Sequence, residues 1–592
     1  MIQADIQIPT TAVESDTPVE PVLEIDEIQG NSLAGFNKDF QTLLFLKITD
    51  ARLTKDWLHD LEPHIATLSE VIQFNRLFKT TRKRRNGREG TVRSTFINIG
   101  FSFEGLKKLT KDADQFIDVP FREGLPKRAS LLGDLTDPAA EGNPKNWLIG
   151  GSENIPDVVL IVASDDQDRL DQEVKWIEFD LKDGLAKSGL KMIFKQPGAT
   201  LPGALSGHEH FGFKDGVSQP GVRGRLSDQA DDFLTARDNP NDPEQGKPGQ
   251  DCLWPGEFVF GYATQIPTPQ PGDKGLNTKP GLCSVAGPAW GKNGSFLVFR
   301  RLRQDVKAFR EFVQATAPEL SANNSAFTGI TPERFGAKFV GRWASGTPIL
   351  RAPHQDIPAM GDDDCANNYF EFEGSSNPLK PGKPEQCQDN FPSNLSQGDV
   401  KGLICPFAGH VRKAYPRDTE RELTASAPNT DESDTQTHRL LRRGIPFGEP
   451  FEDQGQTNEH GSENSDLGAL LQQFIDLILR LLGLNPPKPP KDDTRGLLFL
   501  AYQTSIERQF EFVTRQWVNN PNFPDTGDGH DPIIGQNNAA GANRVRTCVL
   551  QATNPSQNAA ITLPVDWVIP TGGGYFFTPS ISALRYLSDT SA

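Results

Sequence analysis

The order of strand-like and helix-like segments over roughly the first third of the chain is the strongest constraint on its fold. Runs of apolar residues predict strands, and segments with helical spacing and a capping residue follow two of them. The order strand, helix, strand, then strand, helix, strand is that of a ferredoxin-like domain. The predicted strands are residues 40–48, 91–101, 157–163 and 190–195, and the predicted helices are residues 50–68 and 164–181.

A second set of such segments follows a loop at residues 230–250 that is rich in Asp, Pro, Asn and Gly. No obvious sequence repeat relates this set to the first. The predicted strands are residues 257–262, 295–302 and 495–503, and the predicted helices are residues 305–316 and 504–517.

Two insertions interrupt the second half. Residues 361–394 are polar, acidic and rich in proline, which predicts a surface loop. Residues 449–491 contain a wide apolar face between Leu467 and Leu482. This face indicates a helix packed on its own protein or in a dimer interface. A membrane-surface helix is a weaker alternative, because the polar face lacks the Lys and Arg that such helices carry.

Charge and cysteine content exclude several classes of partner. The net charge of -17 opposes binding to nucleic acid, whose phosphates would be repelled. No apolar run is long enough to span a bilayer, so a membrane partner is not expected. The six cysteines form no CxxC pair, which predicts reduced thiols in the cytoplasm. Cys365 and Cys387 lie in one insertion and could pair in an oxidising compartment.

One turn-rich stretch, residues 207–220, holds a carboxylate between glycines. Asp215 directly precedes Gly216, and Gly212 lies three residues before it. Glycine permits backbone angles closed to other residues and lets a backbone approach a flat or bulky group. Two interpretations stay open from this stretch alone: a turn with a solvated Asp, or an acid delivered to a buried site by a stiff turn.

Two segments of the second half bear on that choice. In residues 405–417, His410 follows an apolar run and precedes the cations Arg412 and Arg417. In residues 440–448, Arg442 precedes a turn. A buried imidazole is a good axial ligand for haem iron, and nearby cations suit haem propionates. A lone His is more often structural than a ligand, so each segment by itself leaves both roles open.

Together the three segments resemble the dye-decolorizing peroxidase family. Residues 212–216 match its Gly-x-x-Asp-Gly motif, His410 falls on its proximal histidine, and Arg442 falls on its distal arginine. The resemblance covers most of the chain apart from the insertions. It also extends to residues 28–31, 42–46 and 496–503.

The resemblance implies a haem peroxidase that reduces hydrogen peroxide while oxidising bulky organic donors such as dyes and phenolics. It implies one haem b (iron protoporphyrin IX) per chain, with His410 as the iron ligand. Asp215 would move a proton on the opposite face, and Arg442 would stabilise developing negative charge. The remaining residues expected around the cofactor are Gly212, Phe213 and Gly216, with Arg412 and Arg417 as propionate partners.

Some details around these residues follow from the same resemblance. The acceptor that orients the His410 ring is expected within residues 508–520. The family has an Asn two residues after the distal arginine, where this chain has Gly444, so that polar contact must be absent or replaced. Structural roles are expected for His208, His210 and His438.

On this resemblance the fold class is α+β, with two ferredoxin-like domains that sandwich a haem. We expect a flexible tail over residues 1–27 and an N-terminal domain over residues 28–225, which ends in the turn that carries Asp215. The C-terminal haem-binding domain is expected over residues 226–592, with insertions near residues 361–394 and 449–491.

Two other functions stay open. The first is a haem-binding or iron-handling protein on the same fold, with incidental peroxidase activity, which the fold alone does not exclude. The second is a non-enzymatic interaction protein that uses the acidic loops and the apolar insertion helix. The expected partners are hydrogen peroxide and an organic electron donor, and a homodimer is a further alternative.

Overall fold

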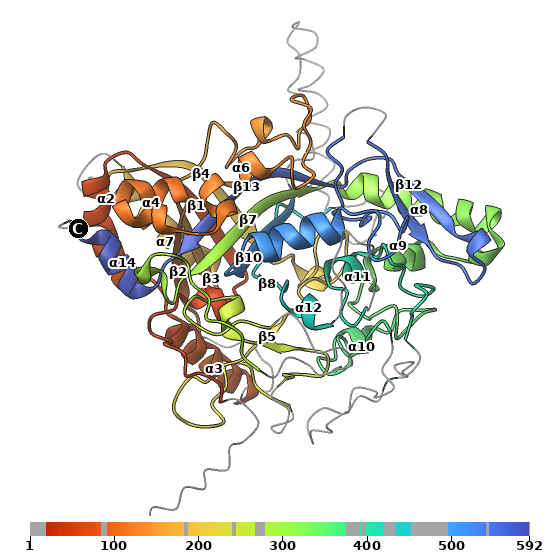
Figure 1. Ribbon diagram of the computed structural model, residues 1–592, viewed down its shortest axis with the longest axis horizontal. Helices are drawn as coiled ribbons and strands as arrows, with labels where there is room; N and C mark the ends of the chain where they lie inside the picture. Colours follow the sequence, from red (N-terminus) through yellow and green to blue (C-terminus); the bar gives the residue numbers. More distant parts are fainter. Residues whose placement is uncertain are drawn as a thin grey trace, which may run out of the picture.

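A computed structural model of the chain shows how these segments are arranged (Figure 1). The residues that the structure describes are 19–84, 92–182, 188–238, 244–266, 279–373, 391, 398–419, 432–451, 495–539 and 544–590.

The first half forms the predicted ferredoxin-like sheet. Its four strands are antiparallel neighbours in the order β4-β1-β3-β2. Asp50 and Asp166 cap the two crossover helices, because their side chains accept from backbone N–H groups in the first turn. The elements are β1 (Phe40–Ile48), α2 (Ala51–Leu61), η1 (Glu62–His64), α3 (Leu68–Arg84), β2 (Thr95–Phe101), β3 (Val158–Ser164), α7 (Gln167–Leu181) and β4 (Leu190–Ala199).

The second half repeats this topology although the two sequences show no repeat. Its strands follow the order β13-β7-β10, and both β8 and β9 pair with the free side of β10. β13 also pairs with β2 through Phe577 and Phe101, which joins the two halves into one sheet. The elements are β7 (Ser295–Gln304), α8 (Val306–Asn323), β8 (Leu441–Arg442), β9 (Ile445–Phe447), β10 (Gly496–Gln503), η8 (Glu507–Glu511), η9 (Val513–Val518) and β13 (Val568–Thr578).

Shorter elements decorate this frame. They are α1 (Gly30–Leu33), α4 (Phe103–Leu109), α5 (Val119–Glu123), α6 (Leu125–Arg128), η4 (Gly203–Leu205), β5 (Gly221–Val222), β6 (Cys252–Leu253), η5 (Pro255–Glu257), α9 (Pro332–Val340), α10 (Pro358–Gly361), α11 (His410–Ala414), α12 (Glu432–Gln436), β11 (Arg546–Leu550), β12 (Ala559–Leu563) and α14 (Ile581–Ser588).

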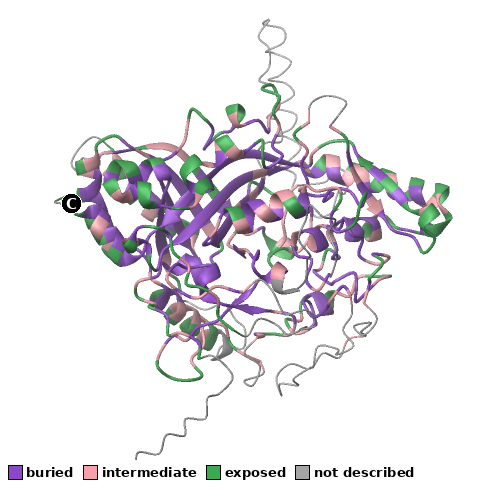
Figure 2. Cartoon of the chain, in the orientation of Figure 1, coloured by how far each residue is buried: buried purple, intermediate pink, exposed green. Residues whose placement is uncertain are grey.

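The sheet curves so that strands from both halves share one interior. The ring of Phe45 on β1 lies 5.0 Å from that of Phe299 on β7, measured between centroids. Gly198 on β4 lies against β9, where an added Cβ would come within 2.9 Å of the Pro446 carbonyl oxygen. Helices α2, α4, α7 and α14 cover the outer face of the sheet, and the central strands β3 and β13 are buried at every residue (Figure 2).

Three segments differ from the sequence-based predictions. Residues 257–262, predicted as a strand, form the end of η5 and a turn. Phe258, Val259 and Phe260 are nevertheless buried, so their apolar pattern marks burial rather than strand geometry. Residues 19–27, assigned to a flexible tail, instead pack on the protein, with Leu23 in a core cluster. Residues 361–373, predicted as surface loop, bury aromatic side chains in another cluster.

The cysteines depart in part from the prediction of reduced thiols. Cys365 is disulfide-bonded, whereas Cys252, Cys283, Cys405 and Cys548 are free. Cys387 and most of the insertion at residues 449–491, including its predicted apolar helix, lie outside the described residues.

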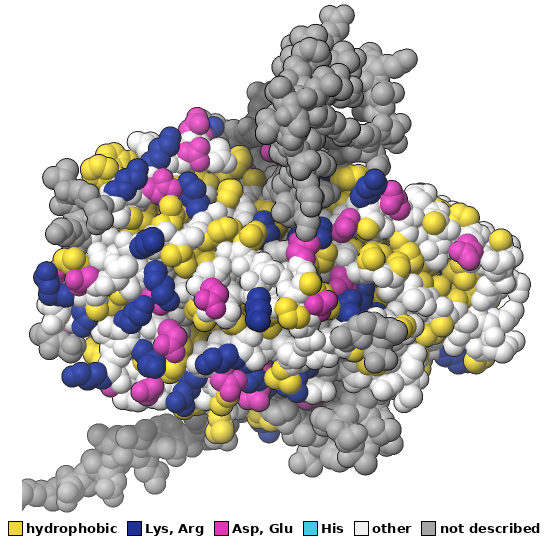
Figure 3. All heavy atoms as spheres, turned by 90° about the horizontal axis from the view of Figure 1, so that it is seen from above, with side chains coloured by type: hydrophobic (Ala, Val, Ile, Leu, Met, Phe, Trp, Pro, Cys, Tyr) yellow, Lys and Arg dark blue, Asp and Glu magenta, His cyan; other side chains and the backbone are white. Residues whose placement is uncertain are grey.

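The surface of the described residues gives no sign of a membrane span. None of their helices combines the length and the hydropathy needed to cross a bilayer. On the face shown in Figure 3, Lys and Arg side chains lie interspersed with Asp and Glu side chains rather than in a field of one sign.

The shared core predicts a large penalty for truncating a central strand. Leu160 on β3 is fully buried, so Leu160→Ala should lower the free energy of unfolding by about 2–5 kcal/mol. Leu131 is 45% exposed, and Leu131→Ala should change this energy by less than about 0.5 kcal/mol. Urea unfolding of both variants checks this, and equal losses would contradict the assignment of β3 to the core.

Candidate active site

One cavity of about 600 Å³ collects the three residues on which the sequence analysis centres. Asp215 reaches it from the glycine-rich turn of the first half, Arg442 from β8 and His410 from α11. These positions lie far apart in the chain, and the fold brings them to one space. The cavity therefore contains a carboxylate, a guanidinium and an imidazole, the set expected for moving a proton beside a metal-bound cofactor.

The turn that carries Asp215 is closed by Glu209. Its carboxylate accepts hydrogen bonds from the backbone N–H of Phe211 at 2.8 Å and of Phe213 at 2.9 Å. Gly212 and Gly216 have φ angles of 99° and 73°, which side chains disfavour, so the glycines expected here are required by the turn. Phe213 and Gly216 line the cavity, as expected for residues around a cofactor, whereas Gly212 does not.

Asp215 and Arg442 form an ion pair inside the cavity. Nη1 of Arg442 lies 3.4 Å from Oδ1 of Asp215, and its Nη2 donates to the Ser218 carbonyl at 3.0 Å. Gln219 holds the backbone of Arg442 from both sides, accepting from its N–H and donating to its carbonyl, each at 3.2 Å. The pair is partly exposed to the cavity space, with 38% of the Asp215 side chain accessible, so Asp215 can meet a small ligand.

His410 is oriented by a buried carboxylate. Its Nδ1 lies 2.8 Å from Oδ2 of Asp531, a side chain with no exposed surface. Burial lowers the pKa of His410, but the charge of Asp531 and this hydrogen bond outweigh it, so the pKa is raised above its ordinary value. A ring that donates from Nδ1 leaves Nε2 with a lone pair for a metal.

Asp531 is the functional residue that the sequence analysis missed, since the acceptor was expected within residues 508–520. Backbone N–H groups of Ile533 and Ile534 donate to its other oxygen at 2.8 and 3.0 Å. These bonds fix the carboxylate next to the ring. An Asp followed by Pro532 is the local signal of such a turn, but it does not reveal which histidine lies opposite.

Arg412 and Arg417 are placed away from the cavity. Nη1 of Arg412 donates to the carbonyls of Asp399 and Cys405, and Nη1 of Arg417 donates to those of Asn368 and Phe370. Neither residue lines the cavity. Arg412 lies two residues after His410 on α11, on the other side of the helix, and Arg417 lies beyond the end of α11.

Other cations do line the cavity, and they fall into two groups. Lys38, Lys214, Arg300 and Arg439 each form an ion pair with a carboxylate, that of Asp165, Asp362, Asp134 and Asp251 respectively. Arg342 and Arg443 donate to carbonyl groups, and neither forms an ion pair with a carboxylate in the described part of the chain. Burial lowers the pKa of Arg342 to about 9 and that of Arg443 to about 10. An anionic group in the cavity would stabilise both cations.

The three histidines expected to be structural are each bonded to a backbone carbonyl. His210 is buried and its Nε2 lies 2.9 Å from the Phe447 carbonyl oxygen. Nδ1 of His208 contacts the Ser206 carbonyl, and Nδ1 of His438 contacts that of Arg508. His208 and His438 also line the cavity. Gly444 lines it too, and an added Cβ there would lie 2.9 Å from the Leu498 carbonyl oxygen, so a side chain such as Asn would displace its neighbours.

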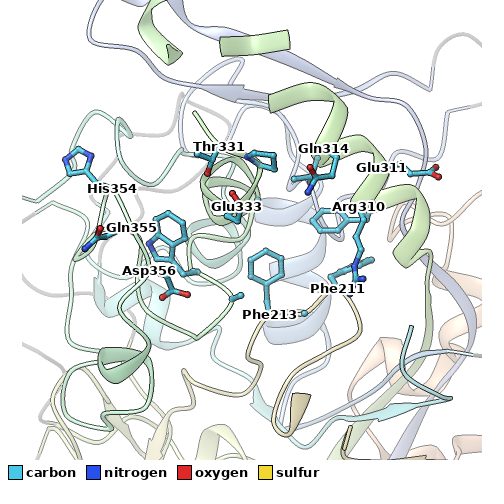
Figure 4. A pocket seen from close by; sticks show the side chains of 17 residues that line it. Phe211, Phe213, Arg310, Glu311, Gln314, Thr331, Glu333, His354, Gln355 and Asp356 are labelled. Carbon is cyan, nitrogen blue, oxygen red and sulfur yellow. The ribbon is translucent and has the colours of Figure 1, made fainter. Parts of the chain in front are cut away.

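Figure 4 shows a second pocket of about 640 Å³, here called the outer pocket, which shares lining residues with the cavity. Phe211 and Phe213 line both the outer pocket and the cavity, whereas Gly212 lines only the outer pocket. Asp215, Arg442 and His410 all belong to the cavity, which is therefore the candidate active site.

The cavity suits a haem on three grounds. The imidazole of His410 is held in the form that binds iron through Nε2. Arg342 and Arg443 supply buried positive charge for carboxylates. The volume of about 600 Å³ lies within the range of cofactor sites, and aromatic and aliphatic side chains supply much of its wall.

Comparisons with known proteins identify close relatives. Residues 27–192 match the DyP dimeric alpha+beta barrel domain. A dye-decolorizing peroxidase of Mycena epipterygia is 30% identical over 97% of this chain and 89% of its own length. A dye-decolorizing peroxidase of Mycetinis scorodonius is 29% identical over 95% of this chain and 87% of its own length.

Solved structures agree with these sequence matches. An ancestral D-type dye decolorizing peroxidase is 31% identical with a TM-score of 0.67, covering 96% of this chain and 100% of its own. A dye-decolorizing peroxidase in complex with 2,6-dimethoxyphenol is 28% identical with a TM-score of 0.62, over the same shares of the two chains.

The environment of Glu209 predicts a pH dependence of stability. Burial raises its pKa from 4.5 to about 7, despite the N–H groups that it accepts. A carboxyl with a raised pKa stabilises the fold while protonated, so its contribution is fully present below its unfolded pKa and is lost as the pH rises through about 7. Relative to Glu209→Gln, the parent should lose on the order of 3 kcal/mol of unfolding free energy between about pH 4.5 and pH 8.

Denaturant unfolding of both proteins across this range measures the difference. A difference that is constant, or that grows in favour of the parent at high pH, would contradict the assigned burial of Glu209.

Proposed function

The chain belongs to the dye-decolorizing peroxidase family, and from this membership we propose that its cavity is the haem site of a peroxidase. The enzyme reduces hydrogen peroxide and oxidises bulky organic donors such as dyes and phenolics. The single observation that carries the site assignment is that Asp215, Arg442 and His410 line one cavity.

The cofactor is one haem b per chain, with its iron bound by Nε2 of His410. When bound, the haem would supply the redox chemistry that couples oxidation of the donors to reduction of peroxide. Asp531 keeps the proton on Nδ1 of His410 and raises the basicity of the ring. Arg342 and Arg443 balance the haem carboxylates, a role for which they are better placed than Arg412 and Arg417.

Asp215 moves the proton that peroxide reduction requires. Its ionised Oδ atoms accept the proton from one peroxide oxygen and return it to the oxygen that leaves as water. Nη1 of Arg442, 3.4 Å from Oδ1, holds the carboxylate in place for this transfer. The guanidinium of Arg442 also stabilises negative charge on the leaving oxygen.

The distal pair also separates this function from that of a haem carrier. A haem carrier needs an iron ligand and cations that bind the propionates. It does not need a carboxylate and a guanidinium that are both exposed inside the cavity. The Asp215–Arg442 pair at 3.4 Å therefore favours catalysis over storage.

Removing either member of the distal pair, Asp215 or Arg442, should lower turnover by at least about 10²-fold while the haem stays bound. We expect Asp215→Asn to lower kcat/KM for peroxide by about 10²–10⁴-fold, because the proton carrier is lost. Arg442→Leu should lower it by about 10²–10³-fold, because a charge-stabilising donor is lost. Stopped-flow reaction with hydrogen peroxide measures both, and the Soret band reports haem content.

The matched control is Asp56→Asn on α2, where the side chain is 51% exposed and does not line the cavity. It should behave like the parent. Parent-like turnover in both Asp215→Asn and Arg442→Leu would rule out the proposed mechanism.

Removing the proposed iron ligand should act on the cofactor itself. His410→Ala removes the imidazole that α11 offers to the iron. After supplementation with haem, the purified variant should therefore show much less Soret absorbance than the parent. His64→Ala, an exposed control in η1, should bind haem like the parent. A Soret spectrum unchanged by His410→Ala would reject His410 as the ligand.

A further inference from the structure

The outer pocket has an aromatic wall in common with the active-site cavity. Phe211 and Phe213 line both spaces, and they stand on the turn that leads to Asp215. Figure 4 shows the ring of Phe213 in the middle of the pocket, between Asp356 on one side and Arg310 on the other. A molecule in the outer pocket is thus separated from the cavity by side chains of a single turn.

The inner wall of the outer pocket is apolar and held in place. Phe309 and Trp343 are buried, and the ring of Phe211 lies 4.5 Å from that of Phe309 between centroids. Nε1 of Trp343 donates to the Ala352 carbonyl at 2.8 Å, which fixes the plane of the indole. Fixed aromatic faces at these separations offer offset or edge contacts to another ring.

Glycine keeps the floor of the outer pocket open. An added Cβ at Gly212 would meet no atom within 4 Å, so the backbone there faces free space. At Gly336 on α9 the nearest atom is Cζ of Phe213, 3.4 Å from an added Cβ. The Phe213 ring therefore rests on α9, and a flat molecule can approach it from the side of Gly212.

The rim of the outer pocket is acidic. Glu311 and Glu333 are exposed, Asp356 is half-buried, and Arg310 is the one Lys or Arg among the residues that line it. Lys307 does not line the pocket, but its Nζ lies 3.8 Å from Oε1 of Glu311. The rim therefore has three carboxylates against two cations, and this excess of negative charge disfavours an anionic ligand and favours a neutral or cationic one. The size, the aromatic wall and this charge all select a small aromatic molecule without acidic groups.

We propose that the outer pocket is a binding site for small neutral or cationic aromatic electron donors such as phenols and aryl amines. This inference rests on the proposed peroxidase function, because the donor is oxidised across the wall of Phe211 and Phe213. Sulfonated dyes, which are bulky and anionic, do not use this site. Each phenol loses one electron and its hydroxyl proton, and two phenols thereby supply the two electrons and two protons that turn one hydrogen peroxide into two waters.

A substitution that fills the pocket tests the site. Gln314 on α8 is exposed and lines the outer pocket, whereas its neighbour Ala315 is exposed and does not. In the haem-loaded enzyme, Gln314→Trp should raise KM for 2,6-dimethoxyphenol about tenfold, a loss of about 1.4 kcal/mol in binding. The sulfonated anthraquinone dye should keep its KM in this variant, and Ala315→Trp should leave both values at those of the parent.

A charge reversal at the rim tests the selectivity. Glu311→Lys should raise KM about fivefold for a trimethylammonium-substituted phenol and lower it for a sulfonate-substituted phenol, because a nearby charge has changed sign. Glu319→Lys on the same helix is the matched control, since Glu319 is exposed and does not line the outer pocket. Glu319→Lys should leave the KM for the trimethylammonium-substituted phenol and the KM for the sulfonate-substituted phenol unchanged.

Binding measured without peroxide separates this inference from the function on which it rests. Line broadening of the methoxy NMR signal of 2,6-dimethoxyphenol should be present with the parent and with Ala315→Trp, and weakened with Gln314→Trp. Equal broadening and equal KM values in Gln314→Trp and the parent would overturn the donor site while leaving the peroxidase intact. A haem-loaded parent that oxidises none of these donors with peroxide would overturn the proposed function, and the donor site with it.

Discussion

The pairing of β8 with β10 is the constraint on which the candidate site depends. Arg442 lies opposite Ala501, and Leu441 opposite Tyr502, at the edge of the sheet of the second half. β10 in turn pairs along its whole length with β7, so this short strand is tied to the middle of the molecule. Since Arg442 belongs to it, the guanidinium has a fixed position over the turn of the first half. A carboxylate on a glycine-rich turn thereby acquires its counter-ion from a strand far along the chain.

Electrostatic balance explains why the cavity suits an anionic, metal-containing cofactor. Burying a charge is costly unless a partner of opposite sign is present, and most cations that line the cavity have one. Arg342 and Arg443 instead rely on carbonyl groups, and burial depresses the pKa of each. On the other side, Asp531 provides negative charge next to His410. The protein thus offers positive charge for the cofactor's carboxylates and an electron-rich ring for its metal.

Glu209 holds the turn that carries both Asp215 and the wall of the outer pocket, Phe211 and Phe213. Its carboxylate holds the backbone N–H groups of Phe211 and Phe213, the residues whose side chains divide the two spaces. The same turn continues to Asp215, whose N–H donates to the Gly207 carbonyl at 3.0 Å. One buried carboxylate therefore positions both the residue proposed to meet peroxide and the residues proposed to meet the donor. A rigid turn with two uses explains the density of glycines around it.

Local patterns in the sequence were sufficient for many of the longer strands and helices, although α3 and β13 were not predicted. The apolar run at residues 40–48 predicted β1 to the residue. A capping residue was expected before the helices that follow two of the strands, and Asp50 and Asp166 are those caps. Gly212 and Gly216 were expected at positions that only glycine occupies easily, and their positive φ angles confirm it. These features depend on contacts within a few residues, which a sequence displays directly. The family resemblance added the order of the motifs, and with it the expectation that Asp215, Arg442 and His410 meet.

Contacts between distant residues were decided by the tertiary structure alone. The acceptor for His410 is Asp531, because the turn at residues 531–534 packs against α11 and no local pattern links the two. Phe258 and its neighbours form an apolar run like that of a strand, but they lie buried in a turn. An apolar run indicates burial and does not by itself indicate strand pairing. The sequence by itself determined the elements, the glycine turn and the residue types of the site. Long-range packing decides three features of the site: which cations line the cavity, which carboxylate orients the imidazole, and where the outer pocket adjoins the cavity. The partners in such packing are set only when the whole chain has folded.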